Sequence, residues 1–503
     1  MLKRLIFLLV PLLLAAVVHA QAPARGDTTI KGHVYTVGAA PDLLAALRAA
    51  PAGTALAYSD IAGRGPLFAP TAAIDTVRAR LQFERVVFLG EVALNNIVFA
   101  SDVQLSDIEF QGGLSALRTR FAGAFGRGKS ASRKHTSFKQ AAFTGSADFS
   151  GTTFARMTSF IEADFNRAVF AHARFAADAY FERTDFRGDA DFRDAFFEDD
   201  ANFKNAHWRG AANFGGARFI QRTRFWQSRF DGPADFDNAR SRGEISFKQV
   251  EFAGPVSFRH ITFVHPVGFQ RAVFRRTATF ADSRFKKAVD FTGARFHADL
   301  DLKAYFKSAL DLRNSRGPTL DLLPPAGERA ADNPDSTFTD TARIYLQRAN
   351  FSRVLCRWSQ LANRLVPTDS TGRDLQPVYE RLVHHLRAQG LDADARACFA
   401  AAMDHRRRTL DWTAPEWYGL QLWRLTTAYG TDLGRLALFT TLCLAVFALL
   451  YRLLGRQPTL GASLFFSFQT FFRAGPAPDN LPAAVETLLG WLCLGLFVAA
   501  LLA

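Results

Sequence analysis

The sequence predicts a mainly β solenoid, followed by an α-helical segment and two transmembrane helices. Aromatic residues recur at alternating steps of five and six residues over much of the chain, and two long apolar segments lie near the C-terminus. Of the 503 residues, 49 are Phe and only nine are Tyr. Such an excess of one bulky residue indicates a repeated structural role, and a strict internal repeat determines the architecture before local propensities do.

The N-terminus has the pattern of a secretory signal. Two basic residues precede an apolar stretch from Leu5 to Val18, and "VHA" ends at Ala20. Small residues at the last and third-last positions fit a cleaved signal peptide at residues 1–20. An uncleaved anchor helix is the alternative, and in either case the start of the chain is expected to meet a membrane.

Residues 21–82 are expected to cap the solenoid. They contain "DLLAALRAAPAG" (42–53), which predicts a short helix, and the apolar "TALAYSDIAG" (54–63). The end of a solenoid exposes apolar side chains and unpaired strand edges, so it needs a covering segment.

The aromatic repeat is strictest between residues 181 and 302. Of its 23 positions 20 are Phe, and the exceptions are Trp208, Ser241 and Leu302. A helix is excluded because a step of five residues rotates a side chain by about 140°, which would split the Phe residues into two stripes. A long strand is excluded because an odd step sends successive side chains to opposite faces.

A chain that turns a corner after every aromatic residue satisfies this pattern. The residues two positions before the aromatics are small or apolar, and none of them is charged. Residues i and i−2 share a face of an extended segment, so both are predicted to point inward and to stack on the next coil. The column predicted from the most regular stretch consists of Phe192, Phe197, Phe203, Trp208, Phe214, Phe219 and Phe225.

Short motifs in this region resemble the Ala-Asp/Asn-Leu/Phe core of pentapeptide-repeat proteins. They include "SADF" (146–149), "DADF" (189–192), "AANF" (211–214) and "PADF" (233–236). That family forms right-handed, four-sided β-helices, so the resemblance implies a right-handed quadrilateral β-helix over residues 83–316. The six-residue step departs from the family pattern and predicts coils of about 22 residues, so about ten coils at ~4.8 Å each give a rod of about 48 Å.

Charged residues on the predicted coils form an acidic group followed by a basic group. The acids are Glu182, Asp185, Asp189, Asp191, Asp194, Glu198, Asp199 and Asp200, and the bases are Lys204, Arg209, Arg218, Arg222, Arg224 and Arg229. We expect solvated corners whose charges pair between coils, and a cation site at the acidic group is the alternative. The near charge balance of the repeats argues against a DNA mimic, so we expect a protein partner along the β-helix and no nucleic acid.

One stretch interrupts the repeat. "GRGKSASRKHT" (126–136) is predicted to be an exposed basic loop that projects from one coil.

A Pro- and Gly-rich stretch at 317–336 predicts a linker, and residues 337–430 predict an α-helical domain. Within it, "TARIYLQRANFSRVLCRWSQLANRLV" (341–366) predicts an amphipathic helix, and 378–404 has the spacing of one tetratricopeptide-like hairpin. The four Cys match no zinc pattern. The sequence has no nucleophile–base arrangement, phosphate loop or metal-ligand spacing, so we predict a non-enzymatic protein without cofactor or metal.

Residues 431–503 predict a membrane module. Segments 436–454 and 483–503 approach the ~20 apolar residues that a spanning helix needs, and the apolar stretch 460–472 is too short to cross. This order resembles the two-helix pore module of potassium-type channels, with "SLFFSFQTFF" (463–472) as the pore helix. The resemblance implies a possible homo-oligomer, a tetramer if the module conducts.

The filter region departs from that resemblance. A potassium filter presents a Thr-x-Gly-Tyr-Gly-Asp run, whereas this chain has "TFFRAGPAPDNLP" (470–482). The pore-like candidates are Thr470, Arg473, Gly475 and Asp479. Because Arg473 would place positive charge at a pore mouth, we do not expect potassium selectivity.

These observations predict a membrane-anchored pentapeptide-repeat scaffold or binding protein. The alternative is an ion channel of the two-helix pore-loop type, not selective for potassium, with the β-helix as its sensory domain. If the signal is cleaved, the chain is a multi-pass protein of a bacterial inner membrane with a periplasmic repeat domain. The loop 455–482 then faces the cytoplasm, and Arg456 and Arg473 against Asp479 agree with the positive-inside rule.

Overall fold

A computed structural model describes residues 27–30, 33–39, 55–59, 61–64, 75–126, 130–324, 337–454, 459–473 and 481–502. The chain divides into two compact units, Met1–Ile344 with Ala349–Arg353, and Tyr345–Arg348 with Val354–Ala503. The predicted signal peptide, the predicted helix at 42–53, and the candidates Gly475 and Asp479 lie outside the described residues.

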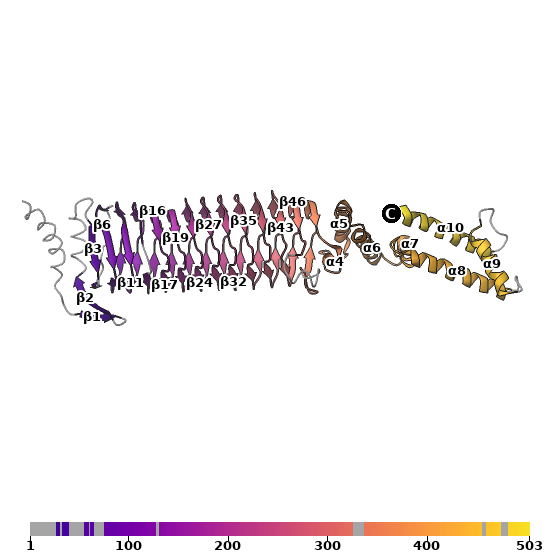
Figure 1. Cartoon of the computed structure of the whole chain (residues 1–503), viewed down its shortest axis with the longest axis horizontal. Helices are drawn as coiled ribbons and strands as arrows, with labels where there is room; N and C mark the ends of the chain where they lie inside the picture. Colours follow the sequence, from indigo (N-terminus) through magenta and orange to yellow (C-terminus); the bar gives the residue numbers. More distant parts are fainter. Residues whose placement is uncertain are drawn as a thin grey trace, which may run out of the picture. The chain divides into compact units, whose positions relative to one another are not determined.

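The first unit is a β-solenoid of about 11 turns with four walls, whose stacked strands are seen in Figure 1. In one coil, β20 (Arg174–Phe175), β21 (Ala179–Tyr180), β22 (Asp185–Phe186) and β23 (Ala190–Asp191) lie in walls 1, 2, 3 and 4. Each strand pairs in parallel with the strand 22 residues later, as Arg174 does with Phe196. The predicted solenoid and its coil length are confirmed.

Walls 1 and 2 are single sheets of 14 and 12 strands. Wall 1 contains β1 (Asp27–Ile30), β2 (His33–Ala39), β4 (Ile61–Arg64), β7 (Val87–Phe88), β11 (Ile108–Phe110), β14 (Ser130–Ser132), β17 (Thr153–Phe154), β20, β24 (Phe196–Phe197), β28 (Arg218–Phe219), β32 (Arg240–Ser241), β36 (Thr262–Phe263), β40 (Arg284–Phe285) and β44 (Tyr305–Phe306). Wall 2 contains β8 (Val92–Ala93), β12 (Leu114–Ser115), β15 (Thr136–Ser137), β18 (Thr158–Ser159), β21, β25 (Ala201–Asn202), β29 (Thr223–Arg224), β33 (Ile245–Ser246), β37 (Val267–Gly268), β41 (Val289–Asp290), β45 (Ala309–Asp311) and β47 (Arg343–Tyr345).

Walls 3 and 4 are linked by strands that run through both. Wall 3 contains β5 (Asp75–Val77), β9 (Ile97–Phe99), β13 (Arg120–Phe121), β22, β26 (His207–Trp208), β30 (Arg229–Phe230), β34 (Glu251–Phe252), β38 (Val273–Phe274) and β42 (Arg295–Phe296). Wall 4 contains β3 (Ala55–Ser59), β6 (Arg80–Glu84), β10 (Val103–Ser106), β23, β27 (Ala212–Asn213), β31 (Ala234–Asp235), β35 (Val256–Ser257), β39 (Ala278–Thr279) and β43 (Leu300–Asp301). The linking strands are β16 (Ala142–Asp148), β19 (Asp164–Val169) and β46 (Arg316–Asp321), and β48 (Asn350–Leu355) neighbours β46.

The interior is filled by small residues and aromatic rings. Ala179 and Phe181, two positions apart, are both fully buried, as the sequence pattern predicted. Each ring stacks on the ring one coil later: the centroids of Phe181 and Phe203 lie 4.9 Å apart, and those of Phe175 and Phe197 lie 4.8 Å apart. Burying one such side chain contributes about 1.5–3 kcal/mol before conformational entropy is counted.

Two kinds of corner explain why five- and six-residue steps alternate. After walls 2 and 4 the turn is tight: Asp191 Oδ1 accepts the Arg193 backbone N–H at 3.0 Å, and Asp194 adopts φ 54°. An Asp or Asn before the aromatic residue therefore shapes the corner, and the left-handed residue closes it. After walls 1 and 3 the corner has one more residue between the aromatic and the next small residue, which makes the step six.

The prediction of an exposed loop at 126–136 is wrong for its described part. β14 and β15 are wall strands, and Ser132 and Thr136 are only 3% and 2% exposed. Ser132 pairs in register with Phe110 and Phe154, so it occupies an aromatic position. Thr136 Oγ1 donates to Ser132 Oγ at 2.6 Å, which satisfies two buried hydroxyls that concealed the repeat in the sequence.

The solenoid also extends beyond the predicted range 83–316. At its N-terminal side, β3 pairs in parallel with β6, so part of the predicted cap forms wall strands. At the other side, β46 continues to Asp321, inside the predicted linker, and the Phe338 ring stacks on Phe306 with centroids 5.0 Å apart. The rest of that linker, 325–336, lies outside the described residues.

The predicted helix at 341–366 is wrong as well. The chain forms β47, β48 and only one short helix, α4 (Trp358–Leu361). Buried residues at spacing two, such as Ala349 and Phe351, fit an extended segment better than a helix. The Phe351 ring packs 6.1 Å from Phe296.

The second unit is helical. After α4 it contains the 3₁₀ turn η1 (Arg373–Leu375), α5 (Gln376–Ala388), α6 (Asp392–Thr409), α7 (Pro415–Thr427), α8 (Leu433–Leu453), α9 (Leu460–Phe471) and α10 (Leu481–Leu502). Helices α5 and α6 form a hairpin closed by Gly390 at φ 71°. Tyr379, Leu382 and Ala395 are buried at the spacing that predicted it.

Candidate functional site

The seven residues of the predicted aromatic column lie inside the solenoid. Phe192, Phe197, Phe203, Trp208, Phe214, Phe219 and Phe225 are all buried. They belong to four stacks, one at each wall, and not to one: Phe192 stacks on Phe214, whereas Phe203 stacks on Phe225. Their role is structural, and the side chains available to a ligand lie on the outer walls.

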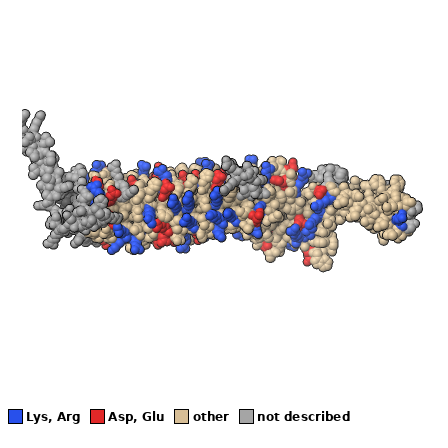
Figure 2. All heavy atoms as spheres, turned by 60° about the horizontal axis from the view of Figure 1, so that its bottom comes forward, with Lys and Arg blue, Asp and Glu red and all other residues tan. Residues whose placement is uncertain are grey.

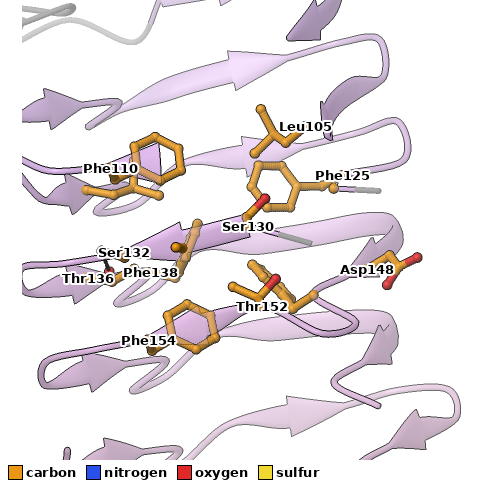
Figure 3. A pocket seen from close by; sticks show the side chains of 14 residues that line it. Leu105, Phe110, Phe125, Ser130, Ser132, Thr136, Phe138, Asp148, Thr152 and Phe154 are labelled. Carbon is orange, nitrogen blue, oxygen red and sulfur yellow. Dashed lines mark hydrogen bonds between the residues drawn. The ribbon is translucent and has the colours of Figure 1, made fainter. Parts of the chain in front are cut away.

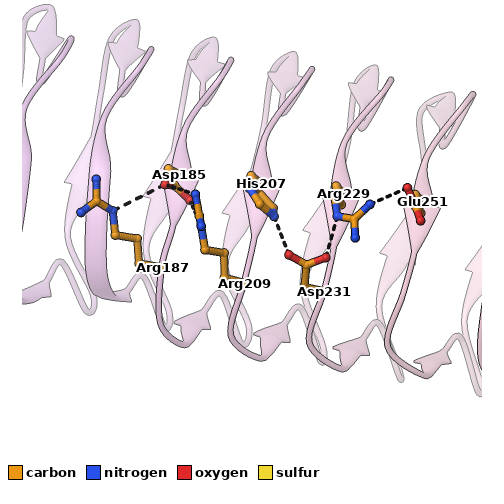
Figure 4. A network of polar contacts seen from close by, with 7 residues as sticks. All are labelled: Asp185, Arg187, His207, Arg209, Arg229, Asp231 and Glu251. Atoms are coloured by element: carbon orange, nitrogen blue, oxygen red, sulfur yellow. Dashed lines mark hydrogen bonds and ion pairs between the residues drawn. The ribbon is translucent and has the colours of Figure 1, made fainter.

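Wall 3 carries a ladder of opposite charges (Figure 4). The Arg209 guanidinium donates to both carboxylate oxygens of Asp185, at 2.9 and 3.0 Å. One coil further on, Asp231 contacts His207 Nε2 and Arg229 Nε, each at 2.6 Å. Arg229 also donates to Glu251 at 2.7 Å, so its guanidinium joins two carboxylates.

The ladder holds its carboxylates ionised. Partial burial raises the pKa of Asp231, but hydrogen bonds from His207 and Arg229 outweigh it and leave that pKa below its usual value. The hydrogen bond from Asp185 raises the pKa of Arg209. Because each charge on this wall has a partner, the ladder reads as a stabilising feature of the surface.

Pairing between coils, as expected from the acidic and basic groups, occurs for several of their members. Besides the Arg209 contact, Arg222 pairs with Asp200 at 3.1 Å, and Arg224 lies 3.8 Å from the same carboxylate. Within the described residues, no group of three His, Cys, Asp or Glu side chains is placed to hold a metal ion.

Wall 1 and the corner after it carry a different set of charges. We define the basic face as seven exposed side chains in three columns along the coils: Arg218, Arg240 and Arg284; Arg242, Lys286 and Lys307; and Lys287. The intervening positions 262, 264, 265 and 305 are Thr, Val, His and Tyr. Figure 2 turns this side of the solenoid toward the viewer, and basic side chains gather along it.

These cations lack the compensation seen on wall 3. Arg218 and Arg240 are direct partners on adjacent strands. Within the described part of the chain, none of the seven side chains forms an ion pair, although Arg284 lies 5.8 Å over the Tyr305 ring. The three columns hold no acid from 218 to 308, and the flanking Glu244 and Asp282 form no ion pair with them. Sequence reasoning missed this face, which appears only when the sequence is aligned at a period of 22.

A small cavity lies inside the solenoid where Ser132 replaces an aromatic ring (Figure 3). It measures about 30 Å³ and is lined by Phe110, Phe154, Thr136 and Thr152, among others. That is close to the volume of one water molecule, so the cavity is too small for an organic ligand.

The second unit contains a buried carboxyl among its apolar helices. Glu486 of α10 accepts a hydrogen bond from Tyr451 Oη of α8 at 2.6 Å and another from Ser467 Oγ of α9. All three side chains are fully buried. This cluster joins the three helices, and Thr487 Oγ1 adds a contact from α10 to the Thr470 carbonyl at 3.0 Å.

One helix of the described chain, at Gly434–Leu453, is long and apolar enough to cross a membrane. Helix α9 and the segment Leu481–Gly495 are shorter apolar helices. Of the pore-like candidates, Thr470 is buried and its hydroxyl donates to the Phe466 carbonyl at 2.8 Å, whereas Arg473 is exposed just after α9. The structure brings these two residues near the same helix end and does not describe the other two.

Comparison with known proteins identifies the repeat. Residues 138–185, 181–229, 225–273 and 265–304 match the family model described as Pentapeptide repeats (9 copies). No curated protein and no solved structure matches the chain. The matched segments all lie in the first unit.

Proposed function

We propose that this chain, whose β-solenoid carries pentapeptide repeats, is a membrane-anchored, non-enzymatic scaffold that binds a protein partner along the solenoid. One observation carries the proposal: stacked rings fill the interior of the coils, so the variable side chains are displayed on the outer walls. Proteins of this repeat class are typically structural or binding scaffolds.

The rigidity of the walls favours such a role. Outward side chains sit at a fixed register, one per strand and coil, and their backbone is held by parallel pairing on both sides. A partner that docks on a preorganised surface loses less conformational entropy than one that docks on a mobile loop.

The apolar helices support the membrane anchor. Leu438, Leu442 and Val446 of α8 and Leu488 and Trp491 of α10 are exposed. An extensive apolar surface of this kind marks a contact with lipid or with another protein. We place both α8 and α10 in a bacterial inner membrane and the repeat domain in the periplasm.

Two assays on cell membranes test this arrangement. The full chain should stay in the pellet after alkaline carbonate extraction, and release into the supernatant would rule out an integral anchor. Protease added to intact spheroplasts should degrade the repeat domain. Full protection, with cleavage only after lysis, would place the repeats in the cytoplasm.

A second candidate function is an ion channel with the solenoid as a sensory domain. The order of α8, α9 and α10, and the cluster around Glu486 that joins them, favour it. Planar-bilayer recording in asymmetric potassium chloride separates the two functions, because the reversal potential reports the permeant ion. We expect either no current or a weakly anion-preferring one, since Arg473 repels cations. A reversal near the potassium equilibrium potential would replace the scaffold by a channel.

The variant Arg473→Gly refines this test. If the protein conducts anions through a path lined by Arg473, the substitution abolishes the current. If a current persists unchanged, Arg473 does not line the path.

A further inference from the structure

We propose that the basic face binds the anionic phosphate headgroups of a lipid bilayer. The basic face consists of Arg218, Arg240, Arg242, Arg284, Lys286, Lys287 and Lys307. The proposal rests on the proposed membrane anchor, because the anchor is what keeps the solenoid close to a bilayer.

The first argument is the uncompensated charge. Arg218 and Arg240 are in direct register on neighbouring strands, and like charges placed in that way destabilise a sheet. The same coils show that the chain can neutralise such positions, since Arg229 on wall 3 contacts both Asp231 and Glu251. A row of cations without carboxylates on one wall therefore points to an anionic partner supplied from outside.

The second argument concerns the spacing of the cations. The columns are interrupted at Thr262, Val264 and His265, so one coil without Arg or Lys separates two groups of cations. A polymer with fixed phosphate spacing would leave unpaired phosphates over that coil. Lipid headgroups diffuse in the plane of the membrane and can gather at each group, so they need no match in spacing.

The third argument is the shape of the surface. Wall 1 is a continuous parallel sheet whose residues 218, 240, 262 and 284 follow one another in register. Its cations lie along a straight row of strands, which suits contact with a planar surface. A candidate membrane span in the same chain raises the effective concentration of headgroups for such a contact.

The test uses the full chain held in nanodiscs of phosphatidylcholine alone, so that its apolar helices are already in lipid. These discs are passed over supported bilayers, one of phosphatidylcholine and one of a phosphatidylcholine–phosphatidylglycerol mixture, and binding is read by surface plasmon resonance. We expect binding to the anionic bilayer only, and we expect high salt to remove it.

Two variants with equal charge change locate the surface. In the first, Arg218, Arg240 and Arg284 are replaced by Gln. Binding should fall about 100-fold, because each basic residue near an anionic membrane contributes about a fivefold gain. In the matched control, Arg187, Arg209 and Arg229 of wall 3 are replaced by Gln, and binding should change less than about twofold, since those guanidinium groups already have carboxylate partners. An equal loss in both variants would mean that net charge alone drives the binding, and would overturn the assignment.

A gain of binding provides a second, independent measurement. Thr262→Arg places a cation in the gap between Arg240 and Arg284, and it should tighten binding about fivefold. No gain from this variant, together with no loss from the Gln variant, would show that wall 1 does not face the lipid.

Two further outcomes would also overturn the proposal. Equal binding to both bilayers would exclude headgroup charge as the determinant. Tighter binding of the same nanodiscs to duplex DNA, with the same dependence on Arg218 and Arg240, would make the face a nucleic-acid surface. Failure of the chain to enter nanodiscs would instead refute the membrane anchor, so the two proposals fail in different ways.

Discussion

Arg218 and Arg240 occupy directly paired positions on adjacent strands of wall 1, and neither forms an ion pair with a described residue. On wall 3, the strands of the same two coils place Asp231 and Glu251 against Arg229. One wall of the solenoid is therefore electrostatically satisfied and the adjoining wall of each coil is not. This difference yields a prediction that separates stability from binding.

Replacing Arg240 by Glu should stabilise the solenoid while it weakens binding to anionic membranes. The new carboxylate can pair with Arg218, and a pair of this kind contributes about 0.2–1 kcal/mol. Thermal unfolding of the full chain in detergent, followed by far-UV circular dichroism, measures the change. The gain should vanish in high salt. A lower midpoint than that of the wild type would show that Arg240 has a stabilising partner.

Removing one ring from the interior should destabilise the coils strongly. Phe214 is 0% exposed and stacks on Phe192 and Phe236 with both centroid distances at 4.9 Å. Phe214→Ala leaves a cavity and should cost about 3–5 kcal/mol. Chemical denaturation measures the loss, and hydrogen exchange should accelerate first in residues 192–236. Trp226→Ala, at a side chain that is 38% exposed, is the control and should change stability far less. Equal effects from both variants would contradict the stacked interior.

The wall 3 ladder should make the solenoid sensitive to acid. The pKa of Asp231 in the folded chain lies below its unfolded value, because His207 and Arg229 donate to it. A carboxyl with a lowered folded pKa contributes stability above its unfolded pKa, near 3.9, and that contribution is lost as the pH falls through the folded pKa. Thermal midpoints should therefore drop below about pH 4, and Asp231→Asn should reduce the drop. An unchanged acid profile in Asp231→Asn would mean that other carboxyls dominate.

The cluster at Glu486 should couple the three apolar helices. Glu486→Ala leaves the Tyr451 hydroxyl and Ser467 without their acceptor, and a buried unsatisfied polar group costs about 1–3 kcal/mol. A double-mutant cycle of Tyr451→Phe and Glu486→Gln, read by thermal unfolding in detergent, should give a coupling of at least about 0.5 kcal/mol. Additive effects would show that the two side chains do not interact in the membrane module.

The solenoid was predictable because its determinants are local and repeated. One small residue and one ring per wall must point inward in every coil, so the pattern appears directly in the sequence from Phe181 to Leu302. The pattern failed at Ser132 and Thr136, where buried hydroxyls satisfy each other and polar residues take inward positions. Comparison with Phe110 and Phe154, 22 residues before and after, contains the missing signal.

The end of the solenoid and the basic face were not predictable from local spacing. An insertion at 325–336 interrupts the repeat, so the returning segment around Phe351 looked like an amphipathic helix. The basic face joins residues from separate coils, and Arg218 appeared in the sequence as one member of a basic group that pairs with acids. Only the register of the coils shows that Arg222 has a carboxylate partner and Arg218 does not.

The oligomeric state of the detergent-solubilised full chain tests the scaffold most directly, because a pore of the two-helix type needs four copies around one axis. Native mass spectrometry, repeated after reconstitution into nanodiscs, gives the number of copies without reference to any ligand. The scaffold predicts a monomer or a dimer. A tetramer that persists in both environments would contradict it and would assign the helices α8, α9 and α10 to a channel.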